Sequence, residues 1–599
     1  MTRRLCILLA VLALPTGCTV GPDYKRPDAP MTATYKEGPL DEKSRAFGWR
    51  GARPCSGVAR GPWWEVYGDP QLNALMAQVN LNNQNILAYE AQFRAATASV
   101  RLSTSAFFPT LGAGASTAHS RGSRNNTLGQ ASSSNGEHGS YSLPLQATYL
   151  VDLWGAVRRD VESGTASAQA VYADLESLRL SIHSQLAQYY FALRGVDAQR
   201  AVLEETVASY QTYLELTKTR QEGGIASKSD VAEAETQLDT TKVRLIDLGI
   251  ERAQYEHAIA VLIGRPPAAF SIRRGPSRPS LPVIPTGLPS DLLERRPDIA
   301  AAERRVAAAN ADIGVAMAAY YPSLTLSANG GPESFKLEKL FDWNSFAWSV
   351  GATLAQTLFD GGAREAQRDI AKAQYQNTVA LYRQTVLTAF QQIEDYLSQI
   401  RILREEAAAQ DKAVASSQRS LDVATEQYKA GIQGYLQVII AQSVVLNNKL
   451  NAVAIRTRRF NATVLLIQGL GGGWDTRGLP TPAEVKAKPS KEGVEEAATA
   501  SDKALYRQSG SRLPLKGGGG GRSVEMIAVP VKSSAVKEVK ASPANVAAAT
   551  KPAKKDASVK AVPSPAATST PPKSASSSSS ASSISTASTS SAVAGPPAP

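Results

Sequence analysis

The apolar residues of this chain fall mostly in long helical stripes. One stripe runs from Ala363 to Gln468 and is interrupted once, at 430–434, where the sequence reads Ala-Gly-Ile-Gln-Gly. The residues that recur at helical or coiled-coil spacing are Val379, Val386, Phe390, Ile393, Leu397, Ile400 and Leu403 before the interruption and Val438, Ala441, Val445 and Ala452 after it. Because glycine permits a tight reversal of the backbone, we predict a long helical hairpin that turns at Gly431 and Gly434.

The first half of the chain repeats this plan. A helical stripe begins at Val157, is interrupted at Gly223 and Gly224, and ends at Pro266. Shorter helical patterns precede each half, over 69–100 and 289–319. Three motifs correspond between the halves: 107–111 with 320–324 at an offset of 213 residues, Asp152 with Asp360 at 208, and 224–225 with 431–432 at 207. We therefore predict two copies of a helix, two strands and a long helical hairpin.

The strand candidates are 111–118 and 141–153 in the first copy and 324–329 and 346–358 in the second. Between the first two, 120–139 is rich in Ser, Asn and Gly, which predicts an exposed loop. The candidates are close to the ~9–11 residues with which a tilted strand crosses a bilayer. Four strands cannot close a barrel, because about eight is the smallest number seen, so a barrel would need several chains. The alternative is an ordinary four-stranded soluble sheet.

The N-terminus has the pattern of a secretory signal. Two arginines precede an apolar run from Leu5 to Leu14, which is too short to span a bilayer as a helix. The signal ends on Gly17-Cys18, which is similar to a bacterial lipobox, where the cysteine becomes the acylated first residue. Thr19 follows, as in lipoproteins sent on to the outer membrane. Acyl chains contribute about 0.8 kcal/mol per buried CH₂, so more than one chain gives stable anchoring. An ordinary signal peptide with an incidental cysteine is the alternative.

Charge, cysteines and missing motifs exclude several classes of function. The net charge is +12, but residues 476–599 carry 17 Lys and Arg against 8 Asp and Glu, so no basic nucleic-acid groove is expected in the rest. Cys6 leaves with the signal and Cys55 lacks an intrachain partner once Cys18 is acylated, so no disulfide is expected.

The four histidines show no metal-ligand spacing, and no Gly-x-Ser-x-Gly or Walker loop occurs. We predict no enzyme, catalytic residue, metal or cofactor. No apolar run of eighteen residues follows the signal, so no transmembrane helix is expected.

These patterns predict six segments. They are a signal peptide (1–17), a lipidated extended segment (18–68), a first repeat (69–267), a linker (268–288), a second repeat (289–474) and a tail (475–599). From Ala497 onward the tail is mostly Ala, Ser, Pro, Lys and Gly, which cannot bury enough apolar surface to offset chain entropy. We therefore predict that the tail is disordered and that the folded part ends near Trp474.

Several of these motifs together resemble a known family. They are 18–27 (Cys-Thr-Val-Gly-Pro-Asp-Tyr-Lys-Arg-Pro), Trp63-Trp64 with 68–72 (Gly-Asp-Pro-Gln-Leu), 292–299 (Leu-Leu-Glu-Arg-Arg-Pro-Asp-Ile), 321–324 (Tyr-Pro-Ser-Leu) and 470–474 (Leu-Gly-Gly-Gly-Trp). The chain resembles the outer-membrane efflux channels of the TolC superfamily, in the lipoprotein branch called NodT-like or OprM-like. The resemblance covers 18–474, although 38–60, which contains Cys55, fits poorly.

The resemblance implies an α+β membrane protein. Three identical chains would form a 12-stranded β-barrel in the outer membrane, continued by a periplasmic α-helical barrel. Asp152 and Asp360 would lie where strands pass into helices, and the loops 120–139 and 330–344 would face outside. The implied partners are a homotrimer, a periplasmic adaptor protein, an inner-membrane RND-type transporter and outer-membrane lipid. Conduction through this subunit would be passive.

The resemblance also implies that the glycine turns form the periplasmic mouth. Many members of the family carry an acid in the second turn, whereas Gly431-Ile432-Gln433-Gly434-Tyr435 has none, which predicts weak sensitivity to divalent cations and pH. Asp230, just after the Gly223-Gly224 turn, is the nearest acid. The alternative function is a structural coiled-coil envelope lipoprotein or adhesin, which would explain the helices but not the two matched strand pairs.

Overall fold

The structure, a computed structural model, describes residues 19–32, 34–37, 62–121, 137–275, 279–282, 284 and 292–487. All of them belong to one compact unit. The predicted signal peptide (1–17), Cys18, Cys55, most of the predicted loop 120–139, part of the predicted linker 268–288 and the tail after residue 487 lie outside the described residues.

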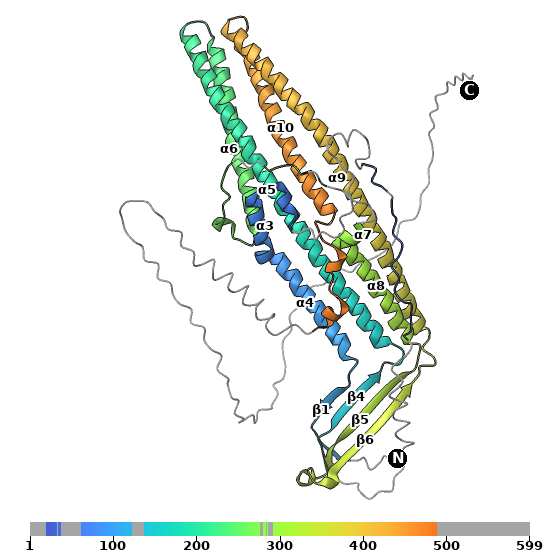
Figure 1. The fold of residues 1–599 in the computed structure, drawn as a ribbon. Helices are drawn as coiled ribbons and strands as arrows, with labels where there is room; N and C mark the ends of the chain where they lie inside the picture. The colour runs from blue at the N-terminus through green and yellow to red at the C-terminus, as the bar shows by residue number, and fades with distance from the viewer. Residues whose placement is uncertain are drawn as a thin grey trace, which may run out of the picture. The chain divides into compact units, whose positions relative to one another are not determined.

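The helices occur in matched pairs (Figure 1). α4 (Gln84–Ser105) and α8 (Pro297–Ala318) have 22 residues each, and α5 (Ala156–Glu222) and α9 (Ala363–Lys429) have 67 each. α6 (Lys228–Leu262) and α10 (Tyr435–Gly469) have 35 each. At 1.5 Å per residue, α5 and α9 are about 100 Å long. The predicted plan of two copies with long helical hairpins is confirmed.

Both shorter helical patterns are broken, so the predictions of one helix over 69–100 and one over 289–319 are wrong at a single point each. α3 (Pro70–Asn82) and α4 meet at Asn83, whose Oδ1 accepts hydrogen bonds from the Asn85 and Ile86 amides and so caps α4. α7 (Leu292–Arg295) and α8 meet at Arg296. The cause is Pro297, which has no amide hydrogen and restricts the residue before it.

The strands form one antiparallel sheet. They are β1 (Thr110–Ala113), β2 (Ser116–Arg121), β3 (Glu137–Ser142), β4 (Leu145–Val151), β5 (Ser323–Ser334) and β6 (Phe346–Ala355). Near the helices the order is β1–β4–β5–β6, and farther along the sheet β5 pairs with β3, which pairs with β2 (Figure 1). The predicted strands 111–118 and 141–153 are each split in two. The predicted loops 120–139 and 330–344 are shorter than expected, because β2, β3 and β5 extend into them; the second also contains the 3₁₀ turns η4 (Leu337–Lys339) and η5 (Trp343–Ser345).

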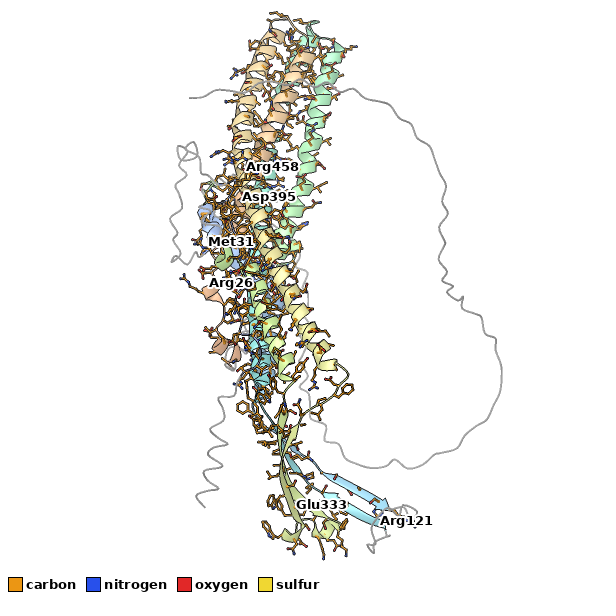
Figure 2. All side chains as sticks on the ribbon, turned by 90° about the vertical axis from the view of Figure 1, so that its right-hand side faces the viewer. Arg26, Met31, Arg121, Glu333, Asp395 and Arg458 are labelled. Carbon is orange, nitrogen blue, oxygen red and sulfur yellow. The ribbon has the colours of Figure 1, made fainter. Side chains whose placement is uncertain are left out.

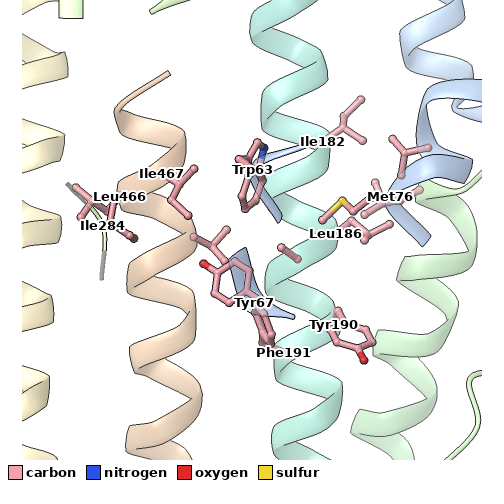
Figure 3. Packing of buried hydrophobic residues seen from close by; sticks show 14 of the residues in the cluster. Trp63, Tyr67, Met76, Ile182, Leu186, Tyr190, Phe191, Ile284, Leu466 and Ile467 are labelled. Atoms are coloured by element: carbon pink, nitrogen blue, oxygen red, sulfur yellow. The ribbon is translucent and has the colours of Figure 1, made fainter. Parts of the chain in front are cut away.

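The largest apolar core joins helices of both copies (Figure 3). Tyr67, from the 3₁₀ turn η1 (Trp63–Tyr67), packs on Phe191 of α5 with ring centroids 4.9 Å apart. Phe191 in turn stacks on Phe460 of α10 at 4.7 Å, and the Tyr67 hydroxyl hydrogen-bonds with Oγ1 of Thr463 at 3.0 Å. Aromatic pairs of this kind contribute about 0.5–1.5 kcal/mol beyond the burial of their area. The core therefore fixes α5 of the first copy beside α10 of the second.

The structured part continues beyond Trp474, so the predicted end of the fold was placed too early. The chain forms η6 (Thr476–Gly478) and α11 (Pro482–Lys486), while η2 (Pro267–Ala269) follows α6 at the start of the predicted linker. Val485 of α11 is buried against Val100 and Ala168. The Pro480 carbonyl accepts a hydrogen bond of 2.9 Å from Nε2 of Gln169. A helix of five residues has too little periodicity to be found from the sequence.

Residues 19–32 and 34–37 form a strap, without helix or strand, that runs over α5, α8 and α9 (Figure 2 labels Arg26 and Met31). At its start Arg159 of α5 donates to the Val20 and Gly21 carbonyls and pairs with Asp23 at 2.9 Å. At its end Glu37 pairs with Arg401 of α9 at 2.7 Å. The strap thus binds both copies of the repeat.

Candidate membrane-spanning sheet and channel aperture

The register divides the sheet β1–β4–β5–β6 into two chemically different faces, because residues paired across antiparallel strands point to the same side. One face carries Leu111, Ala113, Leu145, Ala147, Tyr149, Val151, Leu324, Leu326, Ala328, Gly330, Phe346, Trp348, Val350, Ala352 and Leu354. The other carries Thr110, Gly112, Gln146, Thr148, Leu150, Ser323, Thr325, Ser327, Asn329, Ala347, Ser349, Gly351, Thr353 and Ala355. The first face is apolar except for one tyrosine hydroxyl, and the second is mostly hydroxyl, amide and small groups without charge.

The apolar face is not covered by the described chain. Leu111 is 82 % exposed, Trp348 73 % and Val350 75 %. A soluble antiparallel sheet buries its apolar face against a core and exposes the polar one. The opposite arrangement suits lipid on the apolar face and water in a channel on the polar face. The structure therefore favours the membrane strand interpretation over the ordinary soluble sheet.

Aromatic side chains gather at both ends of this apolar band. Near the helices Trp154 stacks on Tyr321 at 4.7 Å, and Phe108 and Phe359 are exposed. At the far end Trp343 stacks on Phe346 at 6.0 Å, and Phe335, Phe341 and Trp348 are exposed. β6 between them has 10 residues, which is ~33 Å at about 3.3 Å per residue and less once tilted. Two aromatic girdles around an apolar band about 25 Å tall are typical of outer-membrane strands.

One helix has the length and composition of a membrane-spanning segment. Among the described residues, α10 alone is long and apolar enough to cross a bilayer, although the sequence predicted no such helix. Its buried residues, such as Val438 and Val464, pack against other helices of the same chain. This packing accounts for part of the apolar composition of α10, because 33 % of its most apolar stretch is buried within the chain.

The two predicted junction aspartates stand between strand and helix. Asp152 follows β4 and accepts hydrogen bonds from the Val157 and Arg158 amides and from Nε of Arg158 at 3.2 Å. Asp360 lies between β6 and α9 and accepts from the Gly362 and Arg364 amides and from Nε of Arg364 at 2.5 Å. The hydrogen bond from the Arg364 side chain, followed by the backbone donors, lowers the pKa of Asp360. Each carboxylate thus satisfies free amides at a helix N-terminus.

The two predicted glycine turns have the same construction at the other end of the long helices (Figure 1). Gly224 has φ +72° and Gly431 has φ +75°, a region that favours glycine. In each turn the following isoleucine amide donates to the carbonyl five residues earlier, at 2.8 Å for Ile225 and 2.9 Å for Ile432. This pattern closes both helices as Schellman motifs.

The other predicted aperture residues have different surroundings. Gly223 ends α5, Gly434 precedes α10, and Gln433 is exposed. Asp230 forms a capping box with Ser227, so its carboxylate accepts a hydrogen bond from the Ser227 amide at 3.0 Å. The Tyr435 ring is buried against the Tyr428 ring at 5.3 Å, and burial raises the pKa of Tyr435.

Contacts between the two hairpins near the turns were not predicted from the sequence. Nη1 of Arg220 donates to the Lys429 carbonyl at 3.1 Å, and its guanidinium lies 4.7 Å from the centroid of the Tyr428 ring. Tyr213 of α5 hydrogen-bonds with Thr425 of α9 at 3.1 Å. Gln237 of α6 donates to Ser443 of α10 at 3.0 Å. Matching apolar stripes reveal a hairpin, but no sequence signal shows which polar residues of two hairpins meet.

The start of the strap lies at the helix-proximal end of the sheet. The Val20 amide donates to the Trp154 carbonyl at 3.1 Å, and Thr19 lies so close to Gly155 that a Cβ there would be 2.9 Å from its methyl group. Cys18 lies outside the described residues, but its bonded neighbour Thr19 is beside the inner aromatic girdle.

Comparison with known proteins agrees with this geometry. Residues 75–265 and 288–472 match the family described as outer membrane efflux protein. The probable efflux pump outer membrane protein TtgC of Pseudomonas putida is 30% identical over 479 residues, 79% of this chain and 96% of the relative. The outer membrane protein OprJ of Pseudomonas aeruginosa is 31% identical over 474 residues, 78% of this chain and 95% of the relative. The solved outer-membrane channel OprN aligns with a TM-score of 0.69 and 28% identity, over 76% of this chain and 100% of that structure.

The Asp360 carboxylate should make the stability of the protein depend on pH. Because its folded pKa is lowered, its stabilising effect is present above its ordinary pKa of about 3.9 and is lost as the pH falls through the lower folded value. Asp360→Asn should therefore lower the melting temperature at pH 7, and the difference from wild type should narrow below about pH 4. Asp342→Asn removes a carboxylate with no capping bond and should leave the melting temperature unchanged. An equal effect of both variants at pH 7 would contradict the cap.

Proposed function

The chain belongs to the outer membrane efflux protein family and is an outer-membrane channel of an efflux pump, and we propose that three copies of it enclose one continuous passage. The observation that carries the proposal is the sheet, whose uncovered apolar face suits lipid and whose polar face suits a channel wall. The other parts of the proposal concern how the copies join, where the chain is anchored and where the passage closes.

The two outer edges of the chain are formed by different strands and helices, which supports a closed ring of several copies. Near the helices the outer strands of the sheet are β1 and β6, and farther along the sheet β2 also lies at an edge; among the described residues each of the three pairs with a single strand. α4 leads into β1, and β6 leads toward α9. The outer strand and the outer helix therefore lie on the same side of the chain at each edge. Between them α5 packs on α4, α8 packs on α5 and α9 packs on α8 (Figure 1). Joining the β1 edge of one copy to the β6 edge of the next is a heterologous contact, which closes when the rotation between copies allows it.

Near the helices each chain contributes the four strands β1, β4, β5 and β6, so three copies would give a ring of twelve, an even number that fits bacterial outer-membrane barrels. Nearer the turns α6, which packs mainly on α5, forms the helix edge on the same side as α4 (Figure 1), and both helix edges carry exposed apolar side chains that such a contact would cover. On α6 they are Val243, Ile246 and Ile250, with Ile246 76 % exposed, and on α9 they include Ile402 and Val423. Burying a side chain such as isoleucine contributes about 1.5–3 kcal/mol.

The trimer interface can be tested with Ile246→Arg. Placing a charge in an apolar seam should dissociate the purified trimer, because an unpaired buried guanidinium is strongly destabilising. Thr240→Arg introduces the same charge at an exposed position six residues earlier on α6, away from Ile246 around the helix, and should leave the trimer intact. Light scattering in detergent measures the mass of each variant. A trimer that survives Ile246→Arg but not Thr240→Arg would place the interface elsewhere.

Lipidation of Cys18 is the second part of the proposal. Thr19 lies beside Trp154 and Gly155, at the end of the apolar band that faces the helices. An acyl chain on the preceding residue would enter the nearer leaflet without displacing the strap, and two or more chains would anchor the protein stably.

Metabolic labelling with an alkyne analogue of palmitate tests the anchor. The wild-type protein should be labelled, and Cys18→Ala should lose the label. Cys55→Ala, which also removes one cysteine, is the matched control and should keep it. Label that persists in Cys18→Ala, or an unlabelled wild-type protein, would refute lipidation at this position.

The aperture is the third part of the proposal. We place it at the 223–224 and 431–434 turns, where a periplasmic adaptor protein would engage the channel and receive substrate from an inner-membrane RND-type transporter. Flow through this subunit would be passive. Arg220 supports a closed arrangement because it links the α5/α6 hairpin to the α9/α10 hairpin at Lys429 and Tyr428. Gln433 in place of an acid removes one site for divalent cations, and the Asp230 carboxylate is engaged in its capping box.

Single-channel recording of the purified trimer tests the aperture. Arg220→Ala should raise the open probability, because it removes the hydrogen bond and the cation–π contact between hairpins. Lys218→Ala breaks an ion pair with Glu235 inside one hairpin and should leave the open probability unchanged. Millimolar Mg²⁺ should block the current only weakly. Unchanged gating in Arg220→Ala, or a strong block that disappears on replacing Gln433, would contradict this assignment.

A further inference from the structure

A glutamine lies in the apolar seam of α10 near the proposed aperture. Tyr435, Val438, Gln442 and Val445 follow one another at spacings of three, four and three residues, as in the seam of a coiled coil. Val438 is fully buried, Val445 is 5 % exposed and Gln442 is 3 % exposed. Neither the oxygen nor the nitrogen of the Gln442 amide hydrogen-bonds to any part of the chain that the structure describes.

The neighbours of Gln442 in this seam are mostly apolar. Val438 and Tyr435 share a buried cluster with residues of the other hairpin and of α9, namely Tyr210 and Leu214 of α5, Leu238 of α6, and Ala424 and Tyr428 of α9. A buried amide without a partner destabilises the state in which it is buried, because it has given up its hydrogen bonds to water. In the same region the Tyr428 hydroxyl and Nε of Arg220 are also buried without a partner among the described residues.

The first copy of the repeat shows that the fold does not require such a residue. Glu235 occupies the matching position on α6, the eighth residue of a 35-residue helix, as Gln442 does on α10. Its side chain is 49 % exposed and pairs with Lys218 at 2.9 Å. α10 packs against both α9 and α5, whereas α6 packs mainly on α5, so the same position is solvated in one copy and enclosed in the other.

We propose that Gln442 is a positioning residue for channel opening: its unpartnered amide weakens the contact of the two hairpins and favours their separation. When the hairpins separate, water reaches the amide and restores its hydrogen bonds. The closed arrangement is therefore held by the Arg220 contacts and opposed by the seam at Gln442. This inference rests on the proposed location of the aperture at the glycine turns.

The test uses the full-length trimer in planar bilayers, with Arg220→Ala as the background so that openings are frequent enough to measure a decrease. Adding Gln442→Leu should lower the ratio of open to closed time about tenfold, because the seam becomes apolar throughout. The same change should raise the melting temperature. Gln437→Leu, an exposed position on the same helix, is the matched control and should alter neither quantity.

The outcomes separate this inference from the proposed function. A lower melting temperature in Gln442→Leu would overturn it, because the amide would then be satisfied in the assembled channel. A higher melting temperature with unchanged gating would also overturn it, since the seam would not control opening. If Arg220→Ala alone failed to alter gating, the aperture assignment itself would fail, and the melting temperatures would still report on the buried amide.

Discussion

The sheet has an apolar face that no other part of the described chain covers, and this constraint governs the rest of the molecule. Such a face is stable only against lipid, and its polar reverse only against water. A sheet in that position also cannot leave strand edges unpaired in hydrocarbon, since each unsatisfied backbone group costs several kcal/mol. The open edges of β1 and β6 therefore require partners, and the coincidence of strand and helix edges lets one contact satisfy both regions.

The helical part of the chain is stabilised in a different way from the sheet. α5 and α9 are far longer than a compact domain can enclose, so their ends distant from the sheet depend on pairwise packing between helices. Around Tyr67 and Phe191 the packing is aromatic and extensive, whereas near the turns it includes buried polar residues such as Thr217, Thr425 and Gln442. The apolar cluster near the turns is smaller than the one around Tyr67 and Phe191, which suits elements that move.

The sequence predicted the parts of the fold that periodicity and glycine determine. The offset between Gly224 and Gly431 appears in the structure as equal helix lengths, because each turn needs one positive φ at the same place. The breaks at Asn83 and Arg296 were missed, since a single cap or proline does not interrupt an apolar stripe. The contacts of Arg220 and the burial of Gln442 could not be found either, because both depend on which helices of the two copies lie side by side. The helix α11 was missed because its stability comes from Val100 and Ala168, far away in the sequence.

The strap has a kinetic consequence. Its last ion pair joins Glu37 to Arg401, 364 residues apart, and its first contacts hold the segment next to Cys18 against α5. Contacts of such separation form late, because the chain between them must be ordered before they add stability. In a chain that folds from its N-terminus, the far end of the strap therefore cannot bind until α9 has folded, so the second repeat completes the attachment of a segment that the first repeat begins to hold.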